Sequence, residues 1–318
     1  MTDVAERAGA LLVINKADQT LGLVDLAASR MVAAVPLSGY TGHEVAVAPD
    51  GRRAVVPIYS DVGVGQAGTD GRTIDIIDLA TRTRTDTVDL GASVRPHCPQ
   101  FTPSTLLVTG EVGDHVLVMD PDSLTLRGRI PTGAPQAHML AVSADGMVGC
   151  TANIEPGSVS ILDLENRALR AVVPVAGRIN RIVLTPDGGR AYTADQQQPR
   201  LAVVDTVAAE VCGWIPLPGV GFGAAMTASG LIVIALRHEN AIAVIDPAAG
   251  RVERVVPVPR GPQMIVLDER NRCAYSACQH DEVVVEVDLD AGEVTREITV
   301  GRNPDGLCWI PKLPRASH

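Results

Sequence analysis

Short apolar runs rich in Val and Ile alternate with turns that contain Pro, Gly and Asp along almost the whole chain. Within many runs apolar and polar positions alternate, which is the pattern of a β-strand with one buried face. No segment has the 3.6-residue periodicity of an amphipathic helix. The hydrophobic pattern therefore predicts an all-β fold.

Two sequence motifs recur along the chain with the same period. The first is an apolar strand that ends in a turn, as in AVAPDG at 46–51, AVSADG at 141–146 and VLTPDG at 183–188. Its turn position falls at Ala48, Thr102, Ser143, Thr185, Thr227, Asp268 and Ile310, with spacings of 54, 41, 42, 42, 41 and 42 residues. The second is an alternating strand that closes on an aspartate, at Asp25, Asp78, Asp120, Asp163, Asp205, Asp246 and Asp288. Two independent markers with one period predict seven repeats.

Each repeat holds four short strands, which matches the length of a β-propeller blade. Six blades are predicted at about 43–90, 97–131, 138–175, 180–217, 222–258 and 263–300. The seventh combines a single strand at 305–311 with three strands from 10–37. This 1+3 closure leaves no open sheet edge between the two ends of the chain. We therefore expect one seven-bladed propeller domain over residues 1–318.

The repeat unit RINRIVLTPDGGRAYTADQQQPRLAVVDTVAAEVCGWIPLPG resembles the YVTN-type repeat of the lactonase-like seven-bladed propellers. The resemblance covers nearly the whole chain, and it differs from WD40 repeats because the strands close on Ile-Asp or Val-Asp. It implies the fold, whereas the family's functions range from lactone hydrolysis and lyase activity to binding and surface-layer proteins. Function must therefore be argued from a site.

Composition narrows the classes of partner. The chain has 37 acidic and 27 basic residues, a net charge of -10 and 3% aromatic residues, which disfavours nucleic-acid binding. No apolar run approaches the roughly 20 residues that span a bilayer. The first residues carry acids and lack a cleavage site, so we expect no secretion signal and a cytoplasmic location, with six reduced cysteines.

The starts of the innermost strands carry the candidate chemistry. Five residues before each turn marker stand His43, His97, His138, Asn180, Phe222, Gln263 and Asp305. Three histidines thus occupy equivalent positions on consecutive blades, and Asp305 adjoins His43 across the closure. Glu44 and Arg181 follow ring positions, and the loops on the same face add Lys16 and Glu111. An acidic protein is therefore expected to have a basic, histidine-rich mouth.

Three roles fit this ring. His43, His97, His138 and Asp305 offer the donor set of one divalent ion, such as Zn, Fe or Ni. The same imidazoles suit metal-free acid–base chemistry or anion binding, and they also suit hydrogen bonds that only stabilise loops. Calcium-dependent lactonases of the family use Glu, Asn and Asp ligands, which this histidine-rich ring does not match, so we transfer no catalytic assignment.

Further side chains on the same face suggest substrate contacts. Arginines on the loops that enter the ring favour a carboxylate or phosphate ligand. The residues expected to bind substrate are Arg95, Arg181, Arg302, Asn180, Gln263, Phe222, Arg237 and His280. The first repeat also has a glycine-rich insertion at 60–72, which we interpret as either a lid over the mouth or an inert loop.

Two functions of different class follow. The first is a cytosolic enzyme that acts on a small anionic molecule by hydrolysis, elimination or isomerisation, with or without a metal. His97, His138, His43 and Tyr59 are its expected catalytic residues. The second is a non-catalytic binding module that uses the same face for a ligand or a protein partner.

Overall fold

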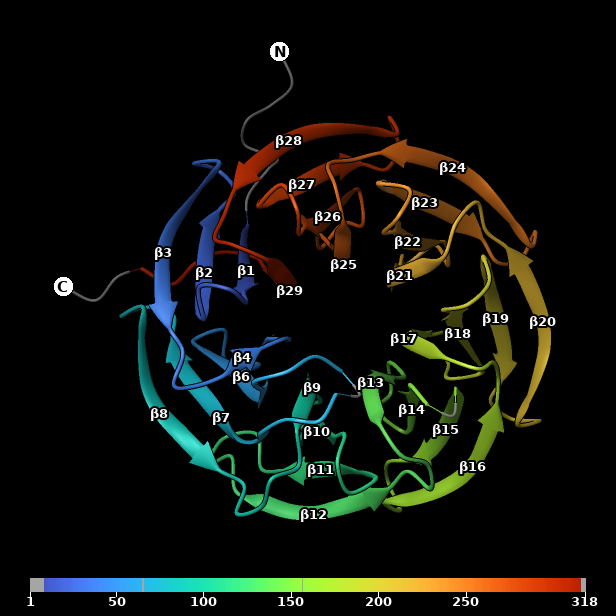
Figure 1. Ribbon diagram of the computed structural model, residues 1–318, viewed down its shortest axis with the longest axis horizontal. Helices are drawn as coiled ribbons and strands as arrows, with labels where there is room; N and C mark the ends of the chain where they lie inside the picture. The colour runs from blue at the N-terminus through green and yellow to red at the C-terminus, as the bar shows by residue number, and fades with distance from the viewer. Residues whose placement is uncertain (1–8, 65, 156, 316–318) are drawn as a thin grey trace.

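The computed structural model describes residues 9–64, 66–155 and 157–315. Seven antiparallel sheets stand around one axis like the blades of a propeller (Figure 1), and the described residues contain no helix. The fold is therefore the predicted all-β, seven-bladed propeller. No helix in the described part of the chain is long and apolar enough to cross a membrane.

In six blades the strands follow each other along the chain, from the innermost to the outermost, whereas the closing blade takes its innermost strand from the end of the propeller sequence. The closing blade contains β29 (Pro304–Ile310), β1 (Ala10–Asn15), β2 (Thr20–Asp25) and β3 (Arg30–Pro36). The first blade contains β4 (Thr41–Gly42), β5 (Ala46–Val47), β6 (Arg53–Ser60), β7 (Asp70–Asp78) and β8 (Thr83–Asp89). The second contains β9 (Pro96–Phe101), β10 (Leu106–Gly110), β11 (His115–Met119) and β12 (Leu126–Pro131).

The other four blades have the same order of strands, and the innermost strand of each is continuous. The third contains β13 (Ala137–Val142), β14 (Val148–Asn153), β15 (Ser158–Asp163) and β16 (Ala168–Pro174). The fourth contains β17 (Ile179–Leu184), β18 (Arg190–Asp195), β19 (Arg200–Asp205) and β20 (Glu210–Pro216). The fifth contains β21 (Gly221–Met226), β22 (Ile232–Leu236), β23 (Ala241–Asp246) and β24 (Arg251–Pro257). The sixth contains β25 (Pro262–Leu267), β26 (Cys273–Cys278), β27 (Val283–Asp288) and β28 (Glu293–Thr299).

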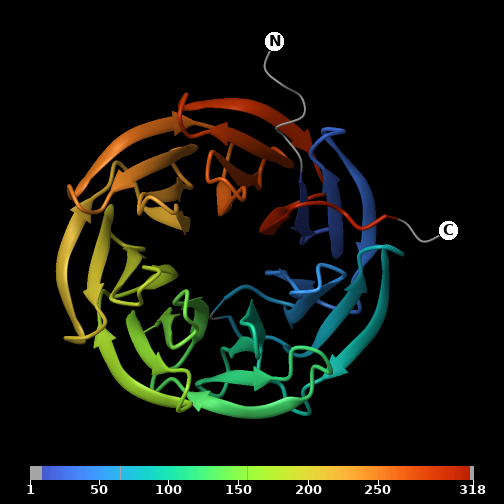
Figure 2. The ribbon, with the colours of Figure 1, turned by 180° about the vertical axis from the view of Figure 1, so that it is seen from behind.

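The ring closes through strands from the two ends of the chain. β29 pairs antiparallel with β1, with Leu12 opposite Cys308. Figure 2 shows this junction from behind, where the red terminal strand lies beside the blue first strand. The predicted 1+3 closure is therefore present.

The recurring aspartates shape the turns between the third and fourth strands. In all seven copies the carboxylate accepts a hydrogen bond from a backbone N–H two or three residues further on, as Asp78 does from Thr81 at 2.7 Å. Short acidic side chains favour this turn geometry. These aspartates are turn residues, which explains why much of the acidic excess lies far from the mouth.

The hydrophobic core lies between neighbouring blades. Tyr192 and Leu201 of the fourth blade, for example, pack with Ile234 and Leu236 of the fifth in one buried cluster. The second strands are buried on both faces, and β22 has no exposed residue. Because this packing uses the bodies of the strands, the ends of the innermost strands around the axis are left to carry other chemistry.

A candidate active site at the histidine mouth

The starts of the innermost strands surround a pocket of about 410 Å³ at one end of the propeller axis. Its lining residues are Lys16, His43, Gly63, Val64, His97, His138, Arg178, Asn180, Arg181, Gln196, Phe222, Arg237, Gln263 and Asp305. All seven residues of the predicted ring are among them. We call this pocket the histidine mouth.

The three histidines of the ring lie together on one side of the mouth. The rings of His97 and His138 stack with centroids 3.6 Å apart and an interplanar angle of 32°, and His43 lies 5.4 Å from His97. The innermost strand of the first blade is interrupted between β4 and β5, and His43 sits in that interruption. The equal spacing of the repeats thus brings together side chains far apart in sequence.

Glu111, which directly follows β10, connects two of the predicted catalytic residues. His138 donates from Nδ1 to the Glu111 carboxylate at 2.9 Å, and the Tyr59 hydroxyl donates to the same carboxylate at 2.8 Å. Arg95 adds a positive charge, with Nη1 3.8 Å from Glu111. Because a carboxylate only accepts hydrogen bonds, this contact places the proton of neutral His138 on Nδ1 and leaves Nε2 as an acceptor.

Burial keeps the imidazoles of the mouth neutral. It lowers the pKa of His43 to about 3, although Asp305 opposes the shift. Burial also lowers the pKa of His97 well below its ordinary value, helped by His138 and His43. The pKa of His138 is lowered by burial too, against the opposing effect of Glu111. Neutral histidines at physiological pH are able to accept a proton.

Tyr59 lies behind the ring and is fully buried. Burial first, and then the Glu111 carboxylate, raise the pKa of its hydroxyl, so it stays protonated. Its hydrogen bond is committed to Glu111, and it is not among the residues that line the mouth. The geometry makes Tyr59 a support for Glu111.

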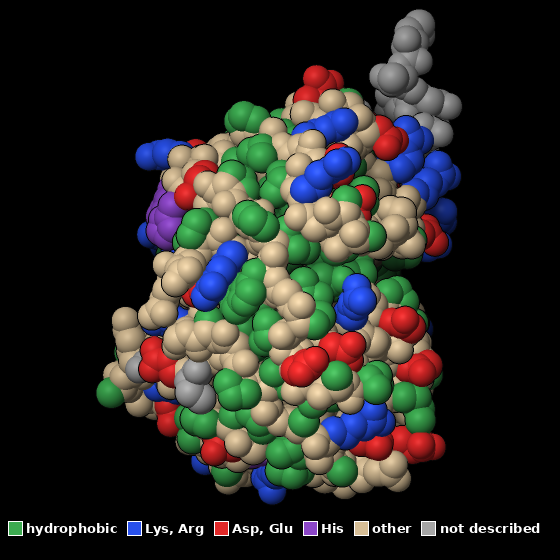
Figure 3. Space-filling view, turned by 90° about the vertical axis from the view of Figure 1, so that its right-hand side faces the viewer, with side chains coloured by type: hydrophobic (Ala, Val, Ile, Leu, Met, Phe, Trp, Pro, Cys, Tyr) green, Lys and Arg blue, Asp and Glu red, His purple; other side chains and the backbone are tan. Residues whose placement is uncertain are grey.

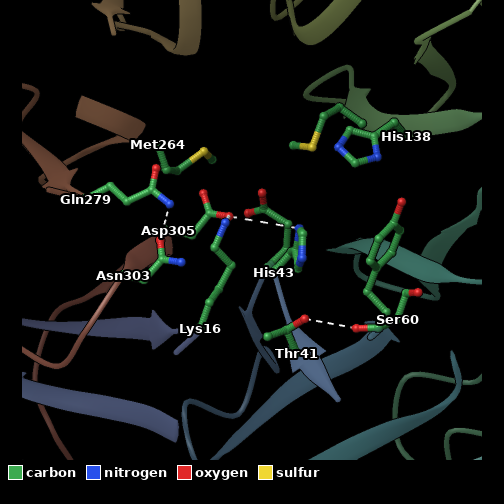
Figure 4. Close-up of polar contacts among 12 residues, drawn as sticks. Lys16, Thr41, His43, Ser60, His138, Met264, Gln279, Asn303 and Asp305 are labelled. Carbon is green, nitrogen blue, oxygen red and sulfur yellow. Dashed lines mark hydrogen bonds and ion pairs between the residues drawn. The ribbon is translucent and has the colours of Figure 1, made fainter. Parts of the chain in front are cut away.

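Charged groups occupy the opposite side of the mouth from His138. Asp305 lies between Lys16, at 2.8 Å, and His43, at 3.9 Å (Figure 4). Arg181 contacts Asp305 at 3.7 Å and also donates to Glu44. Burial alone would raise the pKa of Asp305, but Lys16, His43 and Arg181 outweigh it and hold that pKa below its usual range. Asp305 is therefore ionised.

The lining has an excess of positive charge. Four of its side chains are basic and one is acidic, in a protein whose net charge is -10. Elsewhere the charges are mixed, and Figure 3 shows acidic and basic side chains interspersed over one outer side of the molecule. A concave positive pocket attracts anions.

Several polar atoms at the mouth lack a partner. Among the described residues, the buried atoms without a hydrogen bond include His97 Nδ1, Asn180 Oδ1, Arg181 Nε and Asp305 Oδ1. Buried polar groups are normally paired, and exceptions of this kind gather at functional sites. A polar ligand in the histidine mouth would supply partners for these four atoms.

The remaining predicted contacts fall into two groups. Asn180, Arg181, Phe222, Arg237 and Gln263 line the mouth. The other three do not: Arg302 is exposed and paired with Asp18, His280 is exposed, and Arg95 is buried beside Glu111.

Part of the insertion reaches the histidine mouth. Gly63 and Val64 belong to the lining. Arg95 holds the same segment, since it pairs with Asp70 and donates to the Gln66 carbonyl at 2.7 Å. The insertion thus contacts both the pocket and the arginine beside Glu111, and its role as a lid stays a prediction.

Sequence reasoning assigned no role to Glu111 and Glu44. Glu111 stands in a loop on the histidine face, and Glu44 directly follows a ring position. Their partners, His138 and Arg181, belong to other blades. The repeat pattern predicted that both glutamates lie on the histidine face of the propeller, but it did not predict which residues they contact.

The donor set does not fit a metal ion as it stands. Within the described ranges, no three His, Cys, Asp or Glu side chains are placed to hold one ion. His97 is stacked on His138, and the Nδ1 of His138 is already bonded to Glu111. We therefore derive no chemical step through a metal.

Fold and site together define a seven-bladed propeller with a polar pocket at one end of its axis. No protein-family model matches the sequence, and no curated protein matches it. Among solved structures, the chain is similar to the periplasmic gluconolactonase PpgL of Pseudomonas aeruginosa, with 17% identity, a TM-score of 0.74, and coverage of 96% of this chain and 99% of that one. It is also similar to hydrazine synthase of Kuenenia stuttgartiensis, with 16% identity, a TM-score of 0.73, and coverage of 86% and 90%.

These likenesses show the fold. They confirm, at that level, the predicted resemblance to the lactonase-like seven-bladed propellers. Both solved structures carry the names of enzymes. Their substrates do not transfer to this chain on fold alone.

Proposed function

We propose that this protein is an enzyme that acts on a small anionic molecule at the histidine mouth through proton transfer by His138. The observation that carries the proposal is the 2.9 Å contact between His138 Nδ1 and Glu111 at the wall of a positively charged pocket. A carboxylate behind a neutral imidazole fixes its tautomer and stabilises the imidazolium that forms when Nε2 takes a proton.

The other residues supply binding and polarity. Lys16, Arg181 and Arg237 line the pocket and attract the anionic group of the substrate. The unpaired atoms of His97 and Asn180 are available for its other polar groups. His97, stacked on His138, limits the movement of the base.

The first reaction to test is hydrolysis of an ester or lactone. In that reaction His138 takes a proton from water, the resulting hydroxide attacks the carbonyl carbon, and the ring-opening oxygen receives the proton. In elimination and isomerisation His138 would instead begin by removing a proton from a carbon atom of the substrate. The shared fold with a gluconolactonase favours hydrolysis as the starting assay.

The test is a proton-release assay with a panel of anionic lactones and esters. We expect His138→Gln to lower kcat by about 10²–10⁴-fold, the usual contribution of a general base. His238→Gln is the matched control, because His238 is exposed and lies outside the pocket. If anions bind with micromolar affinity but no panel member is turned over, the site is a binding module and the proposal is wrong.

A chelator separates the metal alternative from this one. We expect protein treated with EDTA and dialysed to keep its activity, because the proposed base needs only Glu111. Loss of activity that Zn²⁺, Fe²⁺ or Ni²⁺ restores would show that His43, His97, His138 and Asp305 rearrange to hold an ion.

A further inference from the structure

The opposite end of the same axis has a second pocket of different character. Its volume is about 350 Å³, and all but two of its fifteen lining residues are apolar. Val47, Phe101, Val266 and Trp309 come from the second halves of the innermost strands, whose starts form the histidine mouth. We call this pocket the apolar mouth. Its size is within the range of small-molecule sites.

A partition of four side chains separates the two pockets. Arg181 lines the histidine mouth, Glu44 lines the apolar mouth, and the two form an ion pair. Met139 and Met264 flank the pair, with their sulfur atoms 3.2 and 3.3 Å from Arg181 Nη1. The carboxylate of Glu44 therefore stands at the inner end of an apolar pocket, while its partner belongs to the other side.

Among the described residues, Glu44 is the only charged one in the lining of the apolar mouth. Burial raises the pKa of its carboxyl group, and Arg181 opposes that shift. A cation that enters the pocket would offset part of the cost of this buried charge.

We propose that the apolar mouth is a second ligand site, for a small apolar molecule with one cationic amino group. The apolar part fills the space between Val47, Phe101, Val266 and Trp309, and the ammonium group points along the axis to Glu44. The proposal goes beyond the function proposed for the histidine mouth and does not depend on it, because no residue lines both pockets.

The test is isothermal titration at pH 7.5 with three probes of similar shape: 2-phenylethylammonium, 2-phenylethanol and 3-phenylpropionate. We expect one equivalent of the ammonium probe to bind, at least about tenfold more tightly than the alcohol, because the ammonium group adds a full positive charge to its hydrogen bond with the Glu44 carboxylate, whereas the hydroxyl group is neutral. The anionic probe should not compete for this site.

Two variants locate the binding. Val266→Trp fills the pocket and should abolish it, whereas His138→Gln, on the other mouth, should leave it unchanged. Glu44→Gln should remove the preference for the ammonium probe over the alcohol. If Glu44→Gln does not fold, the double variant Glu44→Gln/Arg181→Met tests the same point without a buried unpaired charge.

Three results would overturn the proposal. The first is no binding of the ammonium probe at millimolar concentration. The second is equal affinity for the ammonium and alcohol probes, which would indicate apolar contact alone. The third is unchanged binding in a folded Val266→Trp variant, which would place the probe elsewhere.

Discussion

The two mouths are formed by opposite ends of the same innermost strands, yet their chemistry differs sharply. The strand starts bring His97, His138 and Asp305 to one pocket, and the strand ends bring Phe101, Val266 and Trp309 to the other. Packing between blades requires apolar side chains along the bodies of the strands and does not constrain their ends. The difference shows that this fold can vary the chemistry of the two ends independently.

The largest expected effect is a loss of stability when Glu44 is removed from the partition between the two mouths. In Glu44→Ala the buried guanidinium of Arg181 loses its nearest carboxylate and keeps Asp305 at 3.7 Å. Breaking a buried ion pair on one side typically costs about 3–5 kcal/mol of unfolding free energy. Urea denaturation measures this loss. The matched variant Glu44→Gln/Arg181→Met removes both charges and should recover most of it. An equally unstable double variant would show that packing, and not the charge, is responsible.

The next largest expected effect is a loss of catalytic rate when Glu111, beside the histidine mouth, loses its charge. Glu111→Gln keeps the shape of the side chain but removes the charge that stabilises protonated His138, so we expect kcat to fall about 100-fold with little change in KM. The acid limb of the pH–rate profile should move to lower pH, because Glu111 opposes the lowering of the pKa of His138. A purely structural role for Glu111 would leave that limb unmoved. Tyr59→Phe, which removes only one hydrogen bond to Glu111, is the milder comparison.

The pH dependence of stability tests whether the histidines of the histidine mouth are neutral in the folded protein. The folded pKa values of His43, His97 and His138 lie below the ordinary histidine value, so the unfolded chain binds more protons as the pH falls. Their contribution is complete above about pH 6.5 and declines towards pH 3, by up to about 1.4 kcal/mol per pH unit for each histidine. Urea denaturation at pH 7.5 and 5.0 measures the decline. His97→Gln should make it shallower, and an unchanged slope would contradict the assignment of neutral histidines.

The smallest expected effect is on KM when an arginine outside the histidine mouth is removed, and it tests how far the binding site extends. Arg302→Ala removes an exposed arginine that pairs with Asp18 outside the pocket. Exposed ion pairs contribute little, so we expect KM for the anionic substrate to stay within about twofold of the wild-type value. Arg237→Ala, which removes a lining arginine next to Phe222, is the matched comparison and should raise KM more. A large effect of Arg302→Ala would extend the site beyond the described pocket.

The sequence predicted the fold and the ring of the mouth, because both depend on a period that a strand pattern makes visible. Val and Ile alternation, the repeated turn and the closing aspartate placed every blade, and the register then placed His43, His97 and His138 around one axis. The partners of those residues could not be predicted in the same way. Glu111 and Glu44 meet His138 and Arg181 across blade boundaries, and the direction of a long side chain is not set by its register. For the same reason Arg302 and His280, expected on the same face, are exposed and do not line the pocket.

The pairing of β29 with β1 has a consequence for how the molecule forms. Strands β1 to β3 are synthesised well before β29, so their sheet obtains its innermost strand only when residues 304–310 have been made. Contacts between distant parts of a chain form slowly, and synthesis proceeds at about 5–20 residues per second. β1 therefore keeps an unpaired edge through the synthesis of the six blades that separate it from β29. Such an edge is prone to pair with other chains, so the nascent chain is exposed to aggregation at β1 until β29 is added.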